Sequence, residues 1–162
     1  MKVIFLACDG VLNTQYSQSR CGLYIGADAD KLKRLKRLVD TTGAEIILTS
    51  KWRLNRTKRN DDSDTEGLYD YLVRKLKRYG MRIIGQTTDM GGECMNRGHE
   101  IMDWLEKNND IVDGWVVIDS DWYEDYSVKD IKDYIVMTET FGENAGLQDH
   151  DVDKAIEILT RE

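Results

Sequence analysis

The 162-residue sequence contains no proline and only three cysteines. Without proline, its turns depend on the 13 glycines and on Asp, Asn and Thr residues. The cysteines, at positions 8, 21 and 94, form no CxxC pair and cannot all pair with one another. This usage excludes a disulfide-stapled secreted scaffold and favours a reducing, cytoplasmic compartment.

Long apolar runs and an excess of positive charge are also missing. No apolar run approaches the roughly 20 residues of a membrane span, and Met1-Lys2 leads directly into a short strand-like segment. Acidic residues outnumber basic residues by 30 to 23, which gives a net charge of −7. These features argue against a membrane protein and against a protein that coats nucleic acid through a positive field. They still permit a local basic patch.

The length fits a single domain over residues 1–162. Short apolar runs typical of buried strands cover residues 3–6, 46–48, 81–84, 115–118 and 134–137. Helical periodicity lies between and after them, around residues 32–39, 68–76, 101–105 and 152–159. This alternation predicts an α/β fold with three layers, α/β/α, around a Rossmann-like, mostly parallel sheet of about five strands.

Two stretches, residues 13–28 and 55–65, look irregular. In a parallel sheet the ligand crevice lies at the carboxyl ends of the strands, so the residues that follow each strand are the candidates for chemistry. The sequence Ala7-Cys8-Asp9-Gly10 follows the first strand, and hydroxyl and acidic residues follow later ones. Carboxylates brought together from separate strands need a cation between them, and hard oxygen ligands suit Mg²⁺. Hydroxyl groups and a cationic side chain nearby suit a phosphate.

The segment from Phe5 to Asn13 resembles the first motif of the haloacid dehalogenase (HAD) superfamily of phosphohydrolases, in which an apolar strand precedes Asp-x-Asp-Gly-x-Leu or Asp-x-Asp-Gly-x-Thr. Residues 47–50 resemble the second motif, Arg97 the third and residues 119–121 the fourth, in the right order over nearly the whole chain. The stretches 49–53 and 97–101, with Gly146-Leu147, look most like the small capless branch that includes domains of RNA-repair proteins.

The resemblance implies a magnesium-dependent phosphatase that works through an aspartyl-phosphate. In such enzymes the first Asp attacks phosphorus, and the second protonates the leaving oxygen and then activates water. Here the first position is Ala7 and the second is Asp9. Because a methyl group cannot attack phosphorus, we expect the chain as written to be nearly inactive, by a factor on the order of 10⁴–10⁶.

Two explanations compete for Ala7. All other motif positions hold compatible residues. Natural decay would more often have removed several of them together, so the pattern favours a deliberate replacement of one aspartate. The alternative is a natural pseudoenzyme that acts as a phosphate-binding, nucleotide-binding or protein-interaction module. A signalling receiver domain, which also uses strand-end acids, is disfavoured because its acids would occur in another order.

The resemblance also implies roles for individual side chains. Asp9 and Asp119 are the expected Mg²⁺ ligands, with Asp121 as a further candidate. The simpler explanation for Asp9 is an Asp-Gly turn, and for Asp119 it is an acid that ends a strand and faces water. Thr49 and Ser50 are equal candidates for the hydroxyl that binds phosphate. The one that does not bind phosphate would cap the following helix.

A basic group is expected beside the phosphate. Arg97 holds the position of the third motif, although it could simply begin an amphipathic helix. Its rivals are Arg53, with a forked guanidinium that matches phosphate oxygens, and Lys51, which offers a point charge.

Five cations occur within the nine residues from Lys51 to Arg59. A solvated loop is the simplest explanation. The alternative is a clamp, formed by Arg56, Lys58 and Arg59, for a polyanionic substrate such as a nucleotide or an RNA or DNA end. Three aromatic residues could stack a base beside it: Trp52, Tyr16 and Tyr24, although Trp52 could instead belong to the core.

The intervals between the motifs are too short for a large cap domain, which predicts an open crevice. Open members of the superfamily tend to act on larger substrates that enclose the site themselves. We therefore favour a phosphomonoester on a nucleotide or nucleic-acid end over a small phosphorylated sugar.

Overall fold

The computed structural model describes residues 1–59, 64–91, 96–128 and 130–161, so Cys94 lies outside the described residues. Its central sheet has five parallel strands in the order β7-β4-β1-β8-β9. These strands are β1 (Lys2–Leu6), β4 (Glu45–Leu48), β7 (Ile83–Gln86), β8 (Gly114–Asp119) and β9 (Ile135–Met137). Each of the five apolar runs in the sequence supplies one strand, which confirms the predicted parallel sheet.

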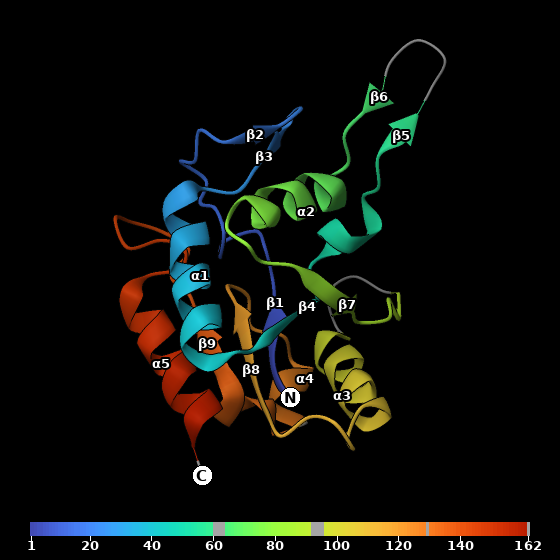
Figure 1. Ribbon diagram of the computed structural model, residues 1–162, viewed down its shortest axis with the longest axis vertical. Helices are drawn as coiled ribbons and strands as arrows, with labels where there is room; N and C mark the ends of the chain where they lie inside the picture. Colours follow the sequence, from blue (N-terminus) through green and yellow to red (C-terminus); the bar gives the residue numbers. More distant parts are fainter. Residues whose placement is uncertain (60–63, 92–95, 129, 162) are drawn as a thin grey trace.

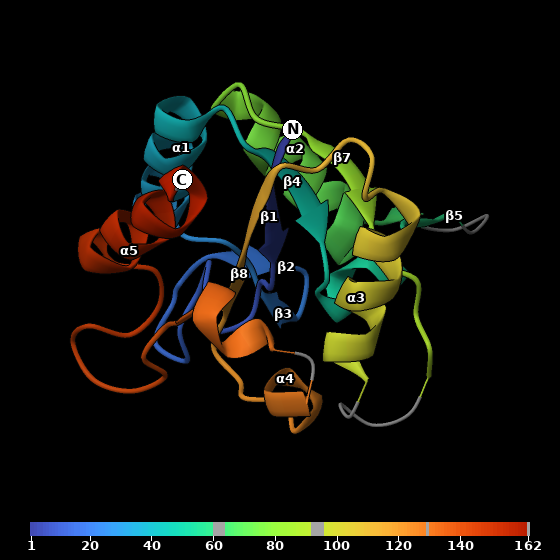
Figure 2. The same cartoon turned by 90° about the horizontal axis from the view of Figure 1, so that it is seen from below.

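Helices cover both faces of this sheet (Figures 1 and 2). One face packs against α1 (Ala29–Thr42), α2 (Leu68–Arg78) and α5 (Asp149–Thr160). The other packs against α3 (Arg97–Lys107), α4 (Asp125–Val128) and the 3₁₀ helix η2 (Ile131–Tyr134). Strand β1 serves both cores, because Ile4 and Leu6 point to the first face while Val3 and Phe5 point to the second. The predicted three-layer α/β/α architecture is confirmed.

The helices follow the apolar spacing of the sequence. In α1, Leu32, Leu35 and Leu38 lie on one buried face, and burying each such side chain contributes about 1.5–3 kcal/mol relative to exposing it. The helix ends at Gly43, whose φ of 67° is left-handed and whose N–H donates to the carbonyl of Val39. This conformation suits glycine because a side chain there would be strained.

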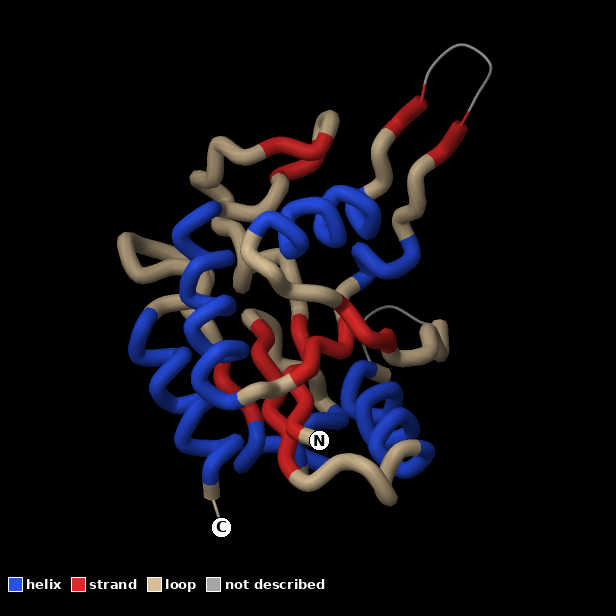
Figure 3. Tube along the Cα trace, in the orientation of Figure 1, coloured by secondary structure: helices blue, strands red, loops and turns tan. Residues whose placement is uncertain are grey.

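The two stretches expected to be irregular contain small antiparallel hairpins. One pairs β2 (Arg20–Cys21) with β3 (Tyr24–Ile25), and the other pairs β5 (Lys58–Arg59) with β6 (Asp64–Thr65). A 3₁₀ helix, η1 (Lys51–Leu54), precedes the second hairpin. Both hairpins lie at the end of the molecule opposite the two chain termini (Figures 1 and 3). Two-residue strands are too short to produce a readable alternation, so no pattern in the sequence indicated them.

The hairpins are the largest additions at this end of the sheet, and the described residues contain no large cap domain, as predicted. No helix in the described parts of the chain is long and apolar enough to cross a membrane.

Candidate active site

The carboxyl ends of β1, β4 and β8 bring the predicted site residues together. Leu6 is in register with Leu48 on one side and Ile118 on the other, so the residues that follow these three strands leave the sheet side by side. A cavity of about 160 Å³ opens there. We call it the acidic cavity. Its lining comprises Ala7, Cys8, Asp9, Ser50, Lys51, Arg97, Asp119, Asp121 and Tyr123.

Asp9 is exposed but held in place. One carboxylate oxygen accepts a hydrogen bond from Asn13 Nδ2 at 3.1 Å, and the other accepts one from Trp52 Nε1 at 3.2 Å. Gly10, which follows, has a φ of 76°, and a Cβ on it would lie 2.3 Å from Ser120 Oγ. Only glycine fits this turn. The acid is therefore oriented by its neighbours while it remains open to solvent and to a ligand.

Asp119 is buried, and its charge is balanced within the protein. Arg97 Nη1 lies 3.1 Å from its Oδ2, and the Tyr126 hydroxyl donates to the same oxygen at 2.7 Å. The other oxygen accepts the backbone N–H groups of Ser120 and Asp121. Every oxygen of this buried carboxylate is thus satisfied by protein donors.

Arg97 and Tyr126 are both fixed in their protonated forms. Burial alone would lower the pKa of the Arg97 guanidinium, but the adjacent Asp119 carboxylate, assisted by Tyr123 and Tyr126, raises it above its usual value. Burial, reinforced by Asp119, raises the pKa of Tyr126 far above the ordinary phenol range. The guanidinium also lies over the Tyr123 ring, 4.7 Å from its centroid. Arg97 is therefore a permanent, ordered cation at the acidic cavity.

The two candidate hydroxyl groups have different surroundings. Ser50 lines the acidic cavity, and its Oγ accepts a hydrogen bond from the Trp52 N–H at the start of η1. Thr49 is fully buried beside Ala7, and its Oγ1 has no hydrogen-bond partner among the described residues. Ser50 thus caps the helix and also borders the cavity, whereas Thr49 does neither.

Arg53, expected as a rival phosphate ligand, is committed elsewhere. Its guanidinium is buried and donates to the carbonyl oxygens of Thr87, Thr49 and Ser50 at 2.6–3.0 Å. It also forms a 3.0 Å ion pair with Glu100. These contacts hold the segment after β4 against α3. Of the three basic candidates, Lys51 and Arg97 line the acidic cavity.

The residues expected to clamp a polyanion lie beyond η1. Arg56 and Lys58 line a second cavity of about 400 Å³ that also includes Tyr24, and Arg59 is exposed on β5. Trp52 is buried in the core and is not available to stack a base. Tyr16 is exposed but is not among the residues that line either cavity.

Sequence reasoning missed three side chains that hold the acids. Asn13 and Trp52 position Asp9, and Tyr126 positions Asp119. From the sequence, residues 122–126 could either approach the site through Asp125 or form a solvated loop, and in the structure Asp125, Tyr123 and Tyr126 are buried. The cluster of aromatic residues after Asp119 was the only available signal.

The acidic residues present do not make a complete magnesium site. Within the described ranges, no three His, Cys, Asp or Glu side chains are grouped so that they could hold a metal ion. Asp9, Asp119 and Asp121 line the cavity, but position 7, where the resemblance places a carboxylate, offers only a methyl group. Oxygen-rich coordination is what Mg²⁺ requires, and the chain as written lacks one of the expected ligands.

An α/β/α domain that gathers acids, a hydroxyl and cations at the ends of β1, β4 and β8 belongs to the class of phosphohydrolase-type folds. A family model described as the HAD domain in Swiss Army Knife RNA repair proteins matches residues 3–152. The chain belongs to this family, a group of small capless HAD domains, as the motifs predicted. Members of the HAD superfamily typically use Mg²⁺. No curated protein and no solved structure shows significant similarity to the chain.

Proposed function

We propose that this domain is built to hydrolyse a phosphomonoester on a nucleotide or nucleic-acid end, through an aspartyl-phosphate at position 7. We further propose that Ala7 leaves the chain as written nearly inactive. The observation that carries the proposal is the lining of the acidic cavity, where Ala7 lies among Asp9, Lys51, Arg97 and Asp119. The side chains to which we assign roles in the reaction, apart from the missing nucleophile, border this one cavity.

Once position 7 carries a carboxylate, each residue of this cavity has a separate role in the proposed reaction. That carboxylate attacks phosphorus, the ester P–O bond breaks, and Asp9 gives its proton to the leaving oxygen. Asp9 then takes a proton from the water that attacks the phosphoryl group, which releases phosphate and restores the carboxylate at position 7. Arg97 and Lys51 lie where they can balance the negative charge of the phosphoryl oxygens, and Ser50 can donate a hydrogen bond to one of them.

We propose that the acidic cavity binds Mg²⁺ only when position 7 carries the nucleophilic carboxylate. The substitution Ala7→Asp adds a carboxylate to a cavity that already holds Asp9, Asp119 and Asp121. Bound there, Mg²⁺ would supply positive charge against the phosphate oxygens. Without that carboxylate, Arg97 is the cation that balances Asp119.

A natural pseudoenzyme that binds a phosphate or nucleotide is the second candidate. It is favoured by the Arg97–Asp119 pair, which leaves the buried acid satisfied without any metal. In this case Lys51 and Arg97 would hold a phosphorylated small molecule or nucleotide that is not turned over.

The substitution Ala7→Asp separates the two candidates. With Mg²⁺ present, we expect this variant to release phosphate from 4-nitrophenyl phosphate at least about 10⁴-fold faster than the chain as written, because a missing nucleophile costs several decades of rate. Ala7→Asn is the matched control, since it has nearly the same shape but no nucleophilic carboxylate. A folded Ala7→Asp chain that releases no phosphate with Mg²⁺ would overturn the phosphatase proposal.

A further inference from the structure

The second cavity lies between the two hairpins, and we call it the hairpin cavity. It measures about 400 Å³, within the usual size of a small-molecule site. One wall comes from the β2–β3 hairpin and the other from the ends of the β5–β6 hairpin, with a lining of Cys21, Gly22, Leu23, Tyr24, Asn55, Arg56, Lys58, Thr65, Glu66 and Gly67. Leu23 is fully exposed and Tyr24 is 57% exposed. Exposed apolar side chains around a cavity are typical of a binding site.

The charge of this lining favours an anion. Glu66 is its only acid, and both of its oxygens are taken by Arg74 at 2.8–3.1 Å. Arg56 and Lys58 supply the positive charge, and Lys58 forms no ion pair with any described residue. A cavity with an exposed aromatic ring and a cation, Lys58, that forms no ion pair with a described residue matches a ligand that is flat and apolar in one part and anionic in another.

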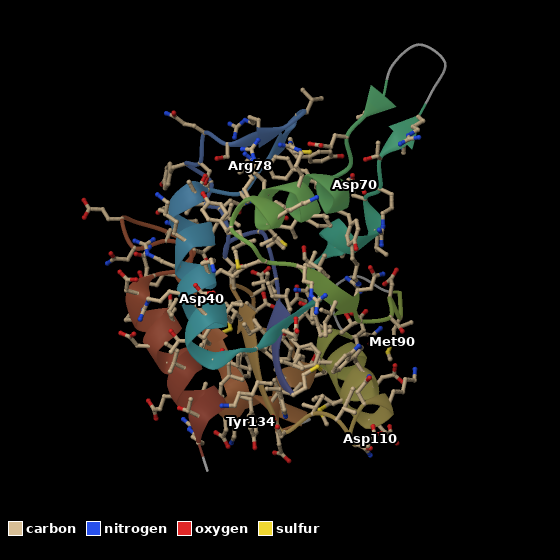
Figure 4. All side chains as sticks on the ribbon, in the orientation of Figure 1. Asp40, Asp70, Arg78, Met90, Asp110 and Tyr134 are labelled. Atoms are coloured by element: carbon tan, nitrogen blue, oxygen red, sulfur yellow. The ribbon has the colours of Figure 1, made fainter. Side chains whose placement is uncertain are left out.

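The walls of the hairpin cavity are held by hydrogen bonds. The Arg56 guanidinium stacks 3.4 Å from the centroid of the Tyr69 ring and donates to Gln86 Oε1 at 3.0 Å. Asp70, labelled in Figure 4, accepts from both the N–H and the hydroxyl of Thr57 at 2.6–2.7 Å, just before β5. Because these groups are ordered before any ligand arrives, little entropy is lost on binding.

The hairpin cavity is tied to the acidic cavity in two ways. Lys51, at the start of η1, borders the acidic cavity, and Asn55, which follows η1, borders the hairpin cavity. A 3₁₀ helix rises about 2.0 Å per residue, so Lys51 and Asn55, which are four residues apart, are separated by roughly 8 Å along the helix axis. Asn13 binds both Asp9 and the carbonyl of Gly26, next to β3. The acid and the hairpin are therefore held in fixed relative positions.

We propose that the hairpin cavity binds a base of a single-stranded nucleic-acid end whose terminal phosphate lies in the acidic cavity. Adjacent nucleotides in a stacked strand are about 3.4 Å apart, so the roughly 8 Å between the lining residues Lys51 and Asn55 corresponds to about two nucleotide steps. Tyr24 stacks the base, and Lys58 contacts the strand through a phosphate. This inference rests on the proposed function for the position of the terminal phosphate. It adds where the base is held and which residues hold it.

The test measures binding to the chain as it stands. Fluorescein-labelled RNA and DNA hexanucleotides, each with a phosphate at its unlabelled 5′ or 3′ end, are titrated by fluorescence anisotropy. Tyr24→Ala is expected to weaken binding about 5- to 150-fold, because the loss of one base stacked on an aromatic side chain lowers the affinity of single-strand complexes by about this factor. Tyr24→Phe keeps the ring and is expected to stay within about 2-fold of the unchanged chain. The matched controls are Phe141→Ala and Lys33→Ala, at exposed positions outside the lining of both cavities.

An abasic probe tests the base itself without altering the protein. Removing the bases of the two nucleotides next to the phosphate is expected to weaken binding as much as Tyr24→Ala does, and Tyr24→Ala is then expected to cause no further loss. No binding of any hexanucleotide, an equal loss with Phe141→Ala, or additive losses from the abasic probe and Tyr24→Ala would each overturn the inference.

This readout is independent of turnover. If Ala7→Asp releases no phosphate but binding still depends on Tyr24 and on the base, the phosphatase proposal fails and the base site stands. If Ala7→Asp is active but Tyr24→Ala binds as tightly as the unchanged chain, the base site fails and the phosphatase stands.

Discussion

Position 49 holds a buried hydroxyl that no described residue satisfies. A buried polar group without a partner costs about 1–3 kcal/mol. We therefore expect Thr49→Val, which keeps the shape and removes the hydroxyl, to leave the free energy of unfolding unchanged or to raise it in urea denaturation. Ser50→Ala is the contrasting change, since it removes the cap of η1 and is expected to cost about 1 kcal/mol. A loss above about 1 kcal/mol for Thr49→Val would show that its hydroxyl has a partner in solution.

Single residues show both what the sequence could predict and what it could not. Asp9, Lys51, Arg97 and Asp119 were expected at one site because each follows a strand or begins a helix at the same edge of the sheet, and all four line the acidic cavity. The Arg53–Glu100 pair could not be foreseen. It joins residues 47 positions apart, and its formation depends on packing rather than on any local pattern.

At the scale of elements, the buried Arg53–Glu100 ion pair links η1 to α3. The side chains of Arg53 and Glu100 are 2% and 8% exposed, and the second oxygen of Glu100 accepts the N–H of Met90, which is labelled in Figure 4. Strand β4, helix α3 and the loop after β7 are thereby held together behind the acidic cavity. Burial lowers the pKa of Arg53, and the adjacent Glu100 carboxylate opposes that effect.

Removing one partner of this pair leaves the other charge buried. We expect Arg53→Leu to lower the free energy of unfolding by about 3–5 kcal/mol, because Glu100 and three carbonyl oxygens lose their donor. Chemical denaturation measures the change. The control is Arg82→Leu, which breaks an exposed 3.6 Å pair with Glu45 and is expected to cost less than about 1 kcal/mol. Equal losses for the two variants would contradict a structural role for Arg53.

The five sheet strands and four longer helices were predictable because burial on one or both faces gives each a readable period. The hairpins were not, whereas the helix expected after Ser50 is present as η1. The hairpin strands have two residues each, and their positions depend on long-range contacts such as the hydrogen bond from Ala27 N–H to Tyr71 Oη. Elements fixed by tertiary contacts rather than by local pattern were missed, and both hairpins border the hairpin cavity.

At the scale of the whole molecule, the net charge of −7 conceals an uneven distribution. Many cations on the helices are neutralised by nearby acids, as in the pairs of Lys36 with Asp40 and of Arg37 with Asp153. The cations near the two cavities include Arg56 and Lys58, which form no ion pair with a described residue. The molecule as a whole repels polyanions, while one end of it can attract them.

This distribution predicts a shallow salt dependence for binding of single-stranded nucleic acid. For single strands, a plot of log K for binding against log[salt] has a slope of about −0.7 for each phosphate contacted. Contacts to two to four phosphates therefore give a slope of about −1.4 to −2.8. Anisotropy titrations of the phosphorylated hexanucleotide between 50 and 300 mM salt measure it. Lys58→Ala is expected to make the slope shallower by about 0.7, and Lys33→Ala is expected to leave it unchanged. A slope steeper than about −4 would mean that the strand spreads over the helix cations, because the cavities alone do not offer that many contacts.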